Sequence, residues 1–172
     1  MAFWSQAGQD QAVVSLLKGK RGGTFLDVGC MDPMWLSNTC TLEQEYGWRG
    51  VGIDMDDSFV SRWKIRPNTK FYLHDALTIN YRQILKDNDM PKVIDFLSLD
   101  LEPPNLTLEC LYKLPFDEYI FRVIAFETDH YREDFRQYEV QSKSREYLTN
   151  LGYIFIQELH QDDLWVHRDY LK

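Results

Sequence analysis

The sequence predicts an α/β fold in which a seven-stranded, mostly parallel sheet carries helices on both faces. Three observations lead to this prediction. Short apolar runs that contain β-branched residues alternate along the chain with segments of helical periodicity. Glycines and capping residues separate the two kinds of segment, as in consecutive βα units. The last two apolar runs are joined by a short polar link, which is typical of an antiparallel hairpin.

The most informative stretch is 24–39, which combines a buried strand, a glycine turn and the start of a helix. The apolar run 25–28 forms the strand, and Gly29 lets the backbone leave it sharply and approach a ligand. Ser37 or Asn38 can cap the next helix, whose N-terminus could also receive a carboxylate. A strand, a glycine turn and a capped helix form the usual ligand cradle of an open α/β sheet.

The remaining elements follow from the same patterns of periodicity and punctuation. The expected strands after the first are 51–54, 70–74, 93–100, 119–127, 153–157 and 164–167. The expected helices are 9–18, a segment ending at 46, 57–64, 81–86, one capped by Asn105, and 142–151. Residues 128–141 are polar and aromatic, which indicates a loop or lid. Five βα units followed by a hairpin are typical of the Rossmann-like sheet of class I methyltransferases.

Composition limits the class of protein. The chain has 172 residues, 44% hydrophobic and 15% aromatic, and no linker or repeat, so a single globular domain over 1–172 is expected. The formal charge is -8, from 19 basic and 27 acidic residues, which disfavours nucleic acid as a partner. We therefore expect no nucleic-acid partner.

The chain also lacks the signals of membrane insertion and export. No apolar run reaches about 18 residues, so no membrane span is expected. The N-terminus does not resemble a signal peptide, and three cysteines outside any CxxC spacing suit a reducing compartment. These observations predict a cytoplasmic protein, and nothing in them specifies an oligomeric state.

Acidic residues follow successive strands and indicate a nucleoside cofactor. Asp27 precedes the glycine turn, Asp54 ends the second strand, and Asp75 follows the third. Asp54 is expected to accept hydrogen bonds from both ribose hydroxyls. Asp75 and Ala76 would border the adenine, although Asp75 could equally cap a helix.

Two neutral residues beside these acids complete the expected cofactor site. Met55 could pack on the adenine face or belong to the core. Cys30 directly follows the glycine, and its small side chain suits packing better than nucleophilic catalysis, because no histidine is near it in sequence.

A series of short motifs runs through nearly the whole chain in a fixed order. They are Ser5-Gln6, Gly8-Gln9-Asp10, Gly23-Thr-Phe-Leu-Asp-Val-Gly29, Ser37-Asn-Thr39, Leu42-Glu43, Gly47-Trp48, Gly50-Val-Gly-Ile-Asp54, Leu99-Asp-Leu-Glu102, Phe126-Glu127, Arg145-Glu-Tyr-Leu148, Gly152-Tyr153 and Asp162-Asp-Leu-Trp-Val-His167. In this order and spacing the chain resembles the FkbM family of methyltransferases. The resemblance implies S-adenosylmethionine as cofactor and O-methylation of a sugar or glycoconjugate hydroxyl, hence a small-molecule or glycan acceptor.

Two segments depart from the family pattern. Pro33 stands where a second glycine is common, and proline offers no N–H to the cofactor carboxylate, so the loop must take a different path. Ser37 and Asn38 could compensate. Glu102-Pro103-Pro104 replaces a Glu-Gly pair followed by an acid, which reshapes the acceptor side.

The acids after the fourth and fifth strands are the candidate catalytic groups. Asp100 and Glu127 end adjacent strands and repel each other unless a proton, an arginine or a cation neutralises them. Asp100 could also contact the cofactor, and His130 is a candidate base. Asp100, Glu127 and Asp129 could hold a hard divalent ion such as Mg²⁺. Pairing with an arginine is the alternative, and the candidates for it are Arg122, Arg132 and Arg136.

Two other functions compete with methyl transfer. An NAD(P)-dependent oxidoreductase would favour Gly-x-Gly-x-x-Gly, whereas the chain has Gly29-Cys-Met-Asp-Pro-Met. A non-catalytic scaffold with the methyltransferase fold is the second alternative, and the altered loop at Pro33 favours it.

Overall fold

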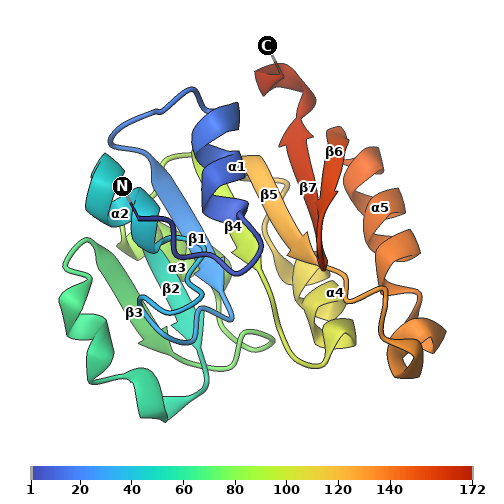
Figure 1. Cartoon of the computed structure of the whole chain (residues 1–172), viewed down its shortest axis with the longest axis horizontal. Coiled ribbons are helices and arrows are strands. Elements are labelled where there is room, and N and C mark those ends of the chain that lie inside the picture. The colour runs from blue at the N-terminus through green and yellow to red at the C-terminus, as the bar shows by residue number, and fades with distance from the viewer. Residues whose placement is uncertain (1, 172) are drawn as a thin grey trace.

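A single mixed sheet organises the protein, whose computed structural model describes residues 2–171. The strand order is β3-β2-β1-β4-β5-β7-β6, and β7 alone runs antiparallel to its neighbours in that sheet (Figure 1). The strands are β1 (Thr24–Val28), β2 (Arg49–Asp54), β3 (Thr69–Leu73), β4 (Val93–Leu99), β5 (Ile120–Glu127), β6 (Tyr153–Leu159) and β7 (Asp162–His167). The helices are α1 (Gln9–Leu16), α2 (Cys40–Tyr46), α3 (Tyr81–Asp87), α4 (Pro104–Lys113) and α5 (Val140–Asn150).

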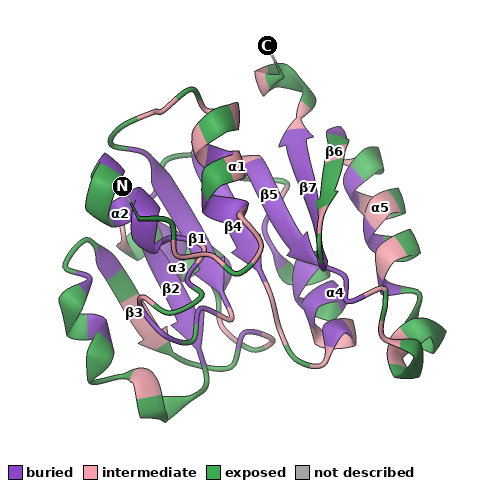
Figure 2. Cartoon of the chain, in the orientation of Figure 1, coloured by how far each residue is buried: buried purple, intermediate pink, exposed green. Residues whose placement is uncertain are grey.

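Helices cover both faces of the sheet, as the sequence predicted. Side chains of β1 lie on opposite faces of the sheet. Phe25 packs with α1 and α2 on one face, whereas Leu26 and Val28 pack with α3, α4 and α5 on the other. The sheet is buried throughout its centre, and the exposed residues lie on the outer sides of the helices, in the loops and on the edge strands β3 and β6 (Figure 2). Because both faces are covered, the central strands are mostly apolar, and Asp27, Asp95 and Arg122 are the charged residues that interrupt β1, β4 and β5 before their last positions.

The strand order reverses between β1 and β4, and this positions the site. The chain moves from β1 outward to β3 and then returns to pair β4 on the other side of β1. In open α/β sheets, ligands bind in the crevice beyond the carboxyl ends of the strands at such a reversal. Residues that follow β1 and β4 therefore lie at the expected ligand site.

Local details differ from the predicted elements. The expected helix 57–64 is two short 3-10 turns, Asp57–Phe59 and Arg62–Ile65. The prediction that Asn105 caps a helix is wrong, because α4 already begins at Pro104 and Pro103 occupies the cap. Proline suits the first helical positions since it needs no hydrogen-bond acceptor there.

The segment 128–141 is partly ordered rather than a plain loop. It contains the 3-10 helix Glu133–Tyr138, and α5 begins at Val140, two residues earlier than expected. The terminal hairpin of β6 and β7 is antiparallel, as predicted.

The N-terminal segment contacts both the connection between β1 and α2 and the start of β7. Ser5 forms an isolated bridge with Leu36 in the β1–α2 connection. The Gln9 side-chain amide donates to the buried carboxylate of Asp162 at 2.5 Å, at the start of β7. Among residues 2–171, no helix combines the length and apolar character needed to cross a bilayer.

Candidate functional site

Two adjoining cavities open at the carboxyl ends of the strands. The larger has a volume of about 510 Å³ and the smaller about 240 Å³. Both are lined by Gly29, Met31 and Asp100, so they meet where β1 and β4 end. Together they form one elongated site across the point where the strand order reverses.

Gly29 is required by the close approach of β1 and β4. It adopts φ 80°, and its backbone N–H donates to the Ile53 carbonyl at 2.9 Å. An added Cβ would lie 1.6 Å from the backbone oxygen of Asp100. The absence of a side chain thus lets the backbone of Asp100 reach the floor shared by both cavities.

The smaller cavity gathers the residues expected around an adenosine. Asp54, Met55, Asp75 and Ala76 all line it. The two carboxylate oxygens of Asp54 accept from the backbone N–H groups of Met31 and Asp56, each at 2.8 Å. Met55 is 75% exposed, which rules out the core alternative for this side chain.

Because residues 76–79 form a turn and Asn80 is the N-cap of α3, Asp75 does not cap a helix, which was its structural alternative. Its Oδ1 accepts from the backbone N–H of Leu77 at 2.8 Å, while Ala76 is buried. The exposed carboxylate borders the cavity.

The larger cavity contains the other residues of the predicted cofactor site: Asp27, Cys30, Ser37 and Asn38. Burial raises the pKa of Asp27 to about 6, although its hydrogen bond from Thr39 and the charge of Arg66 oppose that rise. Burial also raises the pKa of the Cys30 thiol, so this cysteine is not an activated nucleophile.

Ser37 and Asn38 differ in what they leave available to a ligand. Ser37 Oγ accepts from the backbone N–H of Cys40 at 3.2 Å, but the N-cap of α2 is Thr39, so the prediction that Ser37 or Asn38 is the cap is wrong by one or two positions. Asn38 donates to Ser98 Oγ at 2.9 Å, and its buried Oδ1 has no hydrogen-bond partner within residues 2–171. An unsatisfied buried acceptor that belongs to a cavity wall is suited to a ligand N–H.

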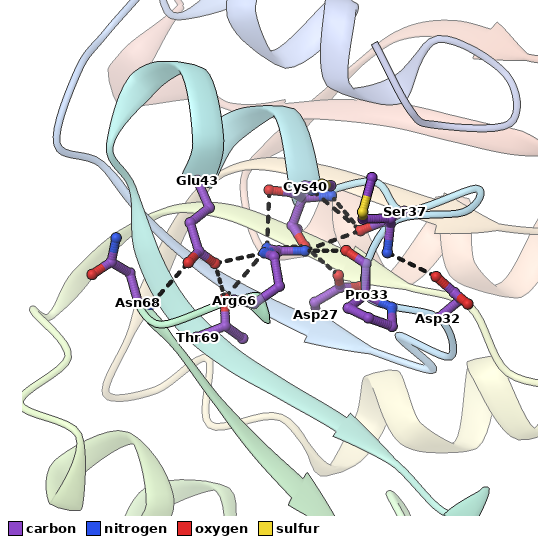
Figure 3. Close-up of polar contacts among 11 residues, drawn as sticks. Asp27, Asp32, Pro33, Ser37, Cys40, Glu43, Arg66, Asn68 and Thr69 are labelled. Atoms are coloured by element: carbon purple, nitrogen blue, oxygen red, sulfur yellow. Dashed lines mark hydrogen bonds and ion pairs between the residues drawn. The ribbon is translucent and has the colours of Figure 1, made fainter. Parts of the chain in front are cut away.

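The β1–α2 loop (residues 29–39) is anchored from outside by a buried arginine, as Figure 3 shows. Arg66 is 1% exposed, and its guanidinium donates to the Pro33 carbonyl at 2.7 Å and to Glu43 Oε2 at 2.6 Å. Pro33 therefore contributes its carbonyl to the loop geometry in place of an N–H. The sequence argument offered Ser37 and Asn38 for this compensation and missed Arg66.

Asp100 and Glu127 lie side by side as predicted, and each affects the pKa of the other. Burial and the hydrogen bond with Asp100 raise the pKa of Glu127 to about 11. Burial also raises the pKa of Asp100, whereas the hydrogen bond from Glu127 lowers it. The raised pKa of Glu127 means that these two adjacent acids are not both ionised at neutral pH.

Arg132 neutralises two further acids near this pair, Asp129 and Glu102. Its Nη1 donates to Asp129 Oδ2 at 2.9 Å and to Glu102 Oε1 at 2.7 Å, so one of the three predicted arginine partners is present. Carboxylate oxygens of Glu102, Glu127 and Asp129 lie within 4.8 Å of one another. The structure thus brings Glu102, rather than Asp100, into the set with metal-ligand spacing.

His130 lies away from the two cavities. It lines a separate hollow of about 230 Å³ beside Arg136 and the start of α5. Its Nδ1 lies 3.0 Å from Thr128 Oγ1 and its Nε2 lies 3.9 Å from Glu158 Oε2. The structure brings Asp100 and Glu127 together but does not bring His130 to them.

The architecture is that of the Rossmann-like class I methyltransferases, which confirms the predicted fold class. Among solved structures, the chain is similar to a candidate rRNA methylase from Clostridium thermocellum, with 16% identity, 96% of each chain covered and a TM-score of 0.61. It is also similar to a SAM-dependent methyltransferase from Aquifex aeolicus, with 16% identity, 94% of this chain and 92% of that chain covered, and a TM-score of 0.55.

A third similar structure contains the expected cofactor. Aeropyrum pernix fibrillarin, in complex with S-adenosyl-L-methionine, has 14% identity and a TM-score of 0.55 over 91% of this chain and 73% of that one. No family model matches the chain, and the search of curated proteins found no match either.

These similarities correct the prediction that nucleic acid is excluded as a partner. That prediction is wrong, because a candidate rRNA methylase shares the fold over 96% of both chains. Net charge sums over the whole surface and does not describe the field at one site. Some of the acids in the total of -8 are buried at the strand ends, where burial raises the pKa of Glu127 and Arg132 pairs with Asp129.

Proposed function

We propose that this protein is an S-adenosylmethionine-dependent methyltransferase. The observation that carries the proposal is the pair of adjoining cavities that meet at Gly29 and Asp100. Their lengthwise arrangement suits a ligand with a nucleoside at one end and an amino acid at the other. The similar fold of a fibrillarin that binds this cofactor supports the assignment.

The residues of the smaller cavity fit the nucleoside end. A carboxylate offers about four lone-pair positions, and the two backbone donors of Asp54 use only two of them. The remaining positions can accept from two ribose hydroxyls. Asp75, Ala76 and Met55 supply one polar and two apolar surfaces for an adenine ring.

The larger cavity fits the amino-acid end. The unpartnered Asn38 Oδ1 and the carboxylate of Asp27 can accept from an ammonium group. The bound cofactor would supply a sulfonium methyl group as the electrophile. Asp100 lies on the floor common to both cavities, which is the position for orienting an acceptor and receiving its proton.

In its protonated form, Glu127 donates a hydrogen bond to Asp100 and adds no second negative charge beside it, which favours the ionised form of Asp100 and opposes the effect of burial on its pKa. An isolated aspartate has a pKa of about 3.9 and is a weak base for a hydroxyl group. Desolvation of Asp100 raises its pKa toward a more useful range. The acceptor class we infer is a hydroxyl of a sugar or glycoconjugate, on the basis of the resemblance to the FkbM family.

Calorimetric titration tests the cofactor. We expect S-adenosylmethionine to bind with a 1:1 stoichiometry and NAD not to bind. Binding of NAD alone would indicate the oxidoreductase alternative, and binding of neither would favour the scaffold. Methyl release should then be screened against sugar acceptors and RNA, and turnover on RNA alone would refute the sugar assignment.

A further inference from the structure

Residues 62–66, which lie between β2 and β3, contact three consecutive residues of the β1–α2 loop. Trp63 Nε1 donates to the Met31 carbonyl at 3.0 Å. The guanidinium of Arg62 forms an ion pair with Asp32. Arg66 donates to the carbonyl of the next loop residue, Pro33. One side chain of this segment therefore meets each residue of the loop from 31 to 33.

The loop needs such support because its backbone is strained. Met31 adopts φ 41° and Leu36 adopts φ 59°, which is the left-handed region that residues other than glycine rarely occupy. Such residues persist only when their surroundings over-determine the conformation. Both belong to the wall of the larger cavity, so the strain lies in the surface that faces the ligand.

Arg66 is the most extensively bonded of the three supporting residues. Besides Pro33, its guanidinium donates to the Thr39 carbonyl at 3.2 Å, Thr39 Oγ1 at 3.2 Å and Ser37 Oγ at 3.4 Å. The guanidinium lies 5.4 Å from the ring centre of Trp63. Its charge is compensated by Glu43, so the loop contacts do not have to neutralise it.

The contacts continue from Arg66 to the cavity through a single hydroxyl. Thr39 Oγ1 accepts from Arg66 and donates to Asp27 Oδ2 at 2.6 Å. Asp27 lines the larger cavity, whereas Arg66 does not. Arg66 thus contacts the loop both in its middle, at Pro33, and at its end, at Thr39, without lining the cavity itself.

We propose that Arg66 is a positioning residue that holds the β1–α2 loop in its ligand-binding path and orients Asp27 through Thr39. It takes the place of the second glycine that this loop lacks at Pro33. The part of the inference that concerns cofactor affinity rests on the proposed function. The part that concerns the loop path does not.

The test uses Arg66→Lys in the full chain. Lysine retains the charge opposite Glu43 but offers one nitrogen, which cannot reach both Pro33 and Thr39 as the planar guanidinium does. Arg145→Lys is the matched control, because Arg145 bonds two carboxylates, Asp163 and Glu158, outside the cavities. Hydrogen exchange of the β1–α2 loop without cofactor and the dissociation constant of S-adenosylmethionine are the two measurements.

We expect Arg66→Lys to accelerate exchange of the loop amides at least tenfold and to weaken cofactor binding at least tenfold. Sheet amides should keep wild-type protection, and Arg145→Lys should change neither quantity. Unchanged loop exchange, or equal loss of protection in loop and sheet, overturns the inference. If Arg66→Lys does not fold, the double variant Arg66→Met with Glu43→Gln, which leaves no buried unpaired charge, is held to the same criteria. Failure of the wild type to bind the cofactor would reject the proposed function, and loop exchange would still decide the role of Arg66.

Discussion

Gly29 and Asp100 approach so closely that a Cβ on the glycine would lie 1.6 Å from the aspartate backbone oxygen. This contact joins the ends of β1 and β4 at the floor of both cavities. It also offers a matched comparison, because Gly47 has a similar φ of 68° with nothing within 4 Å of its added Cβ.

Gly29→Ala should therefore destabilise the protein far more than Gly47→Ala. The left-handed backbone alone costs about 1–2 kcal/mol, which is the expected loss at Gly47. The clash with Asp100 adds the cost of overpacking, for a total of about 2–5 kcal/mol at Gly29. Urea unfolding of both variants measures the difference, and equal losses would contradict the role assigned to this contact.

Asp54→Ala should weaken binding of S-adenosylmethionine while the protein remains folded. A hydrogen bond to a charged group contributes roughly 1.5–3 kcal/mol, so a loss of at least about tenfold in affinity is expected. Because Asp54 also accepts from Met31, part of the loss will come from the loop. The exposed neighbour Asp57, changed to alanine, is the control in calorimetry. Wild-type affinity in Asp54→Ala would show that the ribose is held elsewhere.

Asp27 should make the stability of the protein depend on pH. Its pKa rises from 3.8 to about 6 on folding, so its favourable contribution is complete below pH 3.8 and is lost as the pH rises through about 6. Asp27→Asn keeps the acceptor for Thr39 and has no charge to desolvate. The variant should gain roughly 3 kcal/mol relative to wild type between pH 4 and pH 7, if the pKa difference is converted at 1.36 kcal/mol per unit.

Unfolding in urea at several pH values measures this gain, with the exposed Asp87→Asn as the control. A stability difference between Asp27→Asn and wild type that stays constant from pH 4 to pH 7 would contradict the prediction. The effect would then have to come from packing rather than from ionisation.

Arg132→Met should expose the latent metal-binding capacity of the acids near it. The guanidinium now neutralises Asp129 and Glu102, and its removal leaves carboxylates that a hard cation can bridge. We expect Mn²⁺ to raise the melting temperature of this variant, since an ion at 100 times its Kd stabilises by about 2.7 kcal/mol. Arg136→Met is the control, because Arg136 is an exposed arginine paired with Glu133. Equal Mn²⁺ effects on both variants would mean that this cluster binds no ion.

The strands and the acids at their ends could be predicted because both depend on local patterns. Phe25, Leu26 and Val28 are apolar whatever their strand pairs with, and the carboxyl ends of parallel strands must converge. This is why Asp27, Asp54 and Asp100 could be assigned to one site, and all three line its cavities.

The residues that the sequence did not reveal act through distant partners. Arg66 is 23 residues from Glu43, 33 from Pro33 and 27 from Thr39, and no periodicity connects them. Arg132 is one of three candidate arginines, but its partner Glu102 is 30 residues away, and the sequence could not single it out from Arg122 and Arg136. An arginine before a proline has no local signature of burial, and only the folded chain shows that it is 1% exposed.

The bonds from the N-terminal segment to the terminal hairpin have a consequence for the order of folding. Gln9 and Asp162 are 153 positions apart, and Gln6 and Gln161 are 155 apart. Contacts between residues so far apart in the sequence close the largest loops in the chain. The conformational entropy lost on closing such a loop is the greatest, and it is lost before the contact contributes any favourable energy. We expect these contacts to form after the central strands, which pulse-labelled exchange would detect as late protection around residues 5–10. Because Gln6 borders the larger cavity, ligand binding would then be among the last abilities that the chain acquires as it folds.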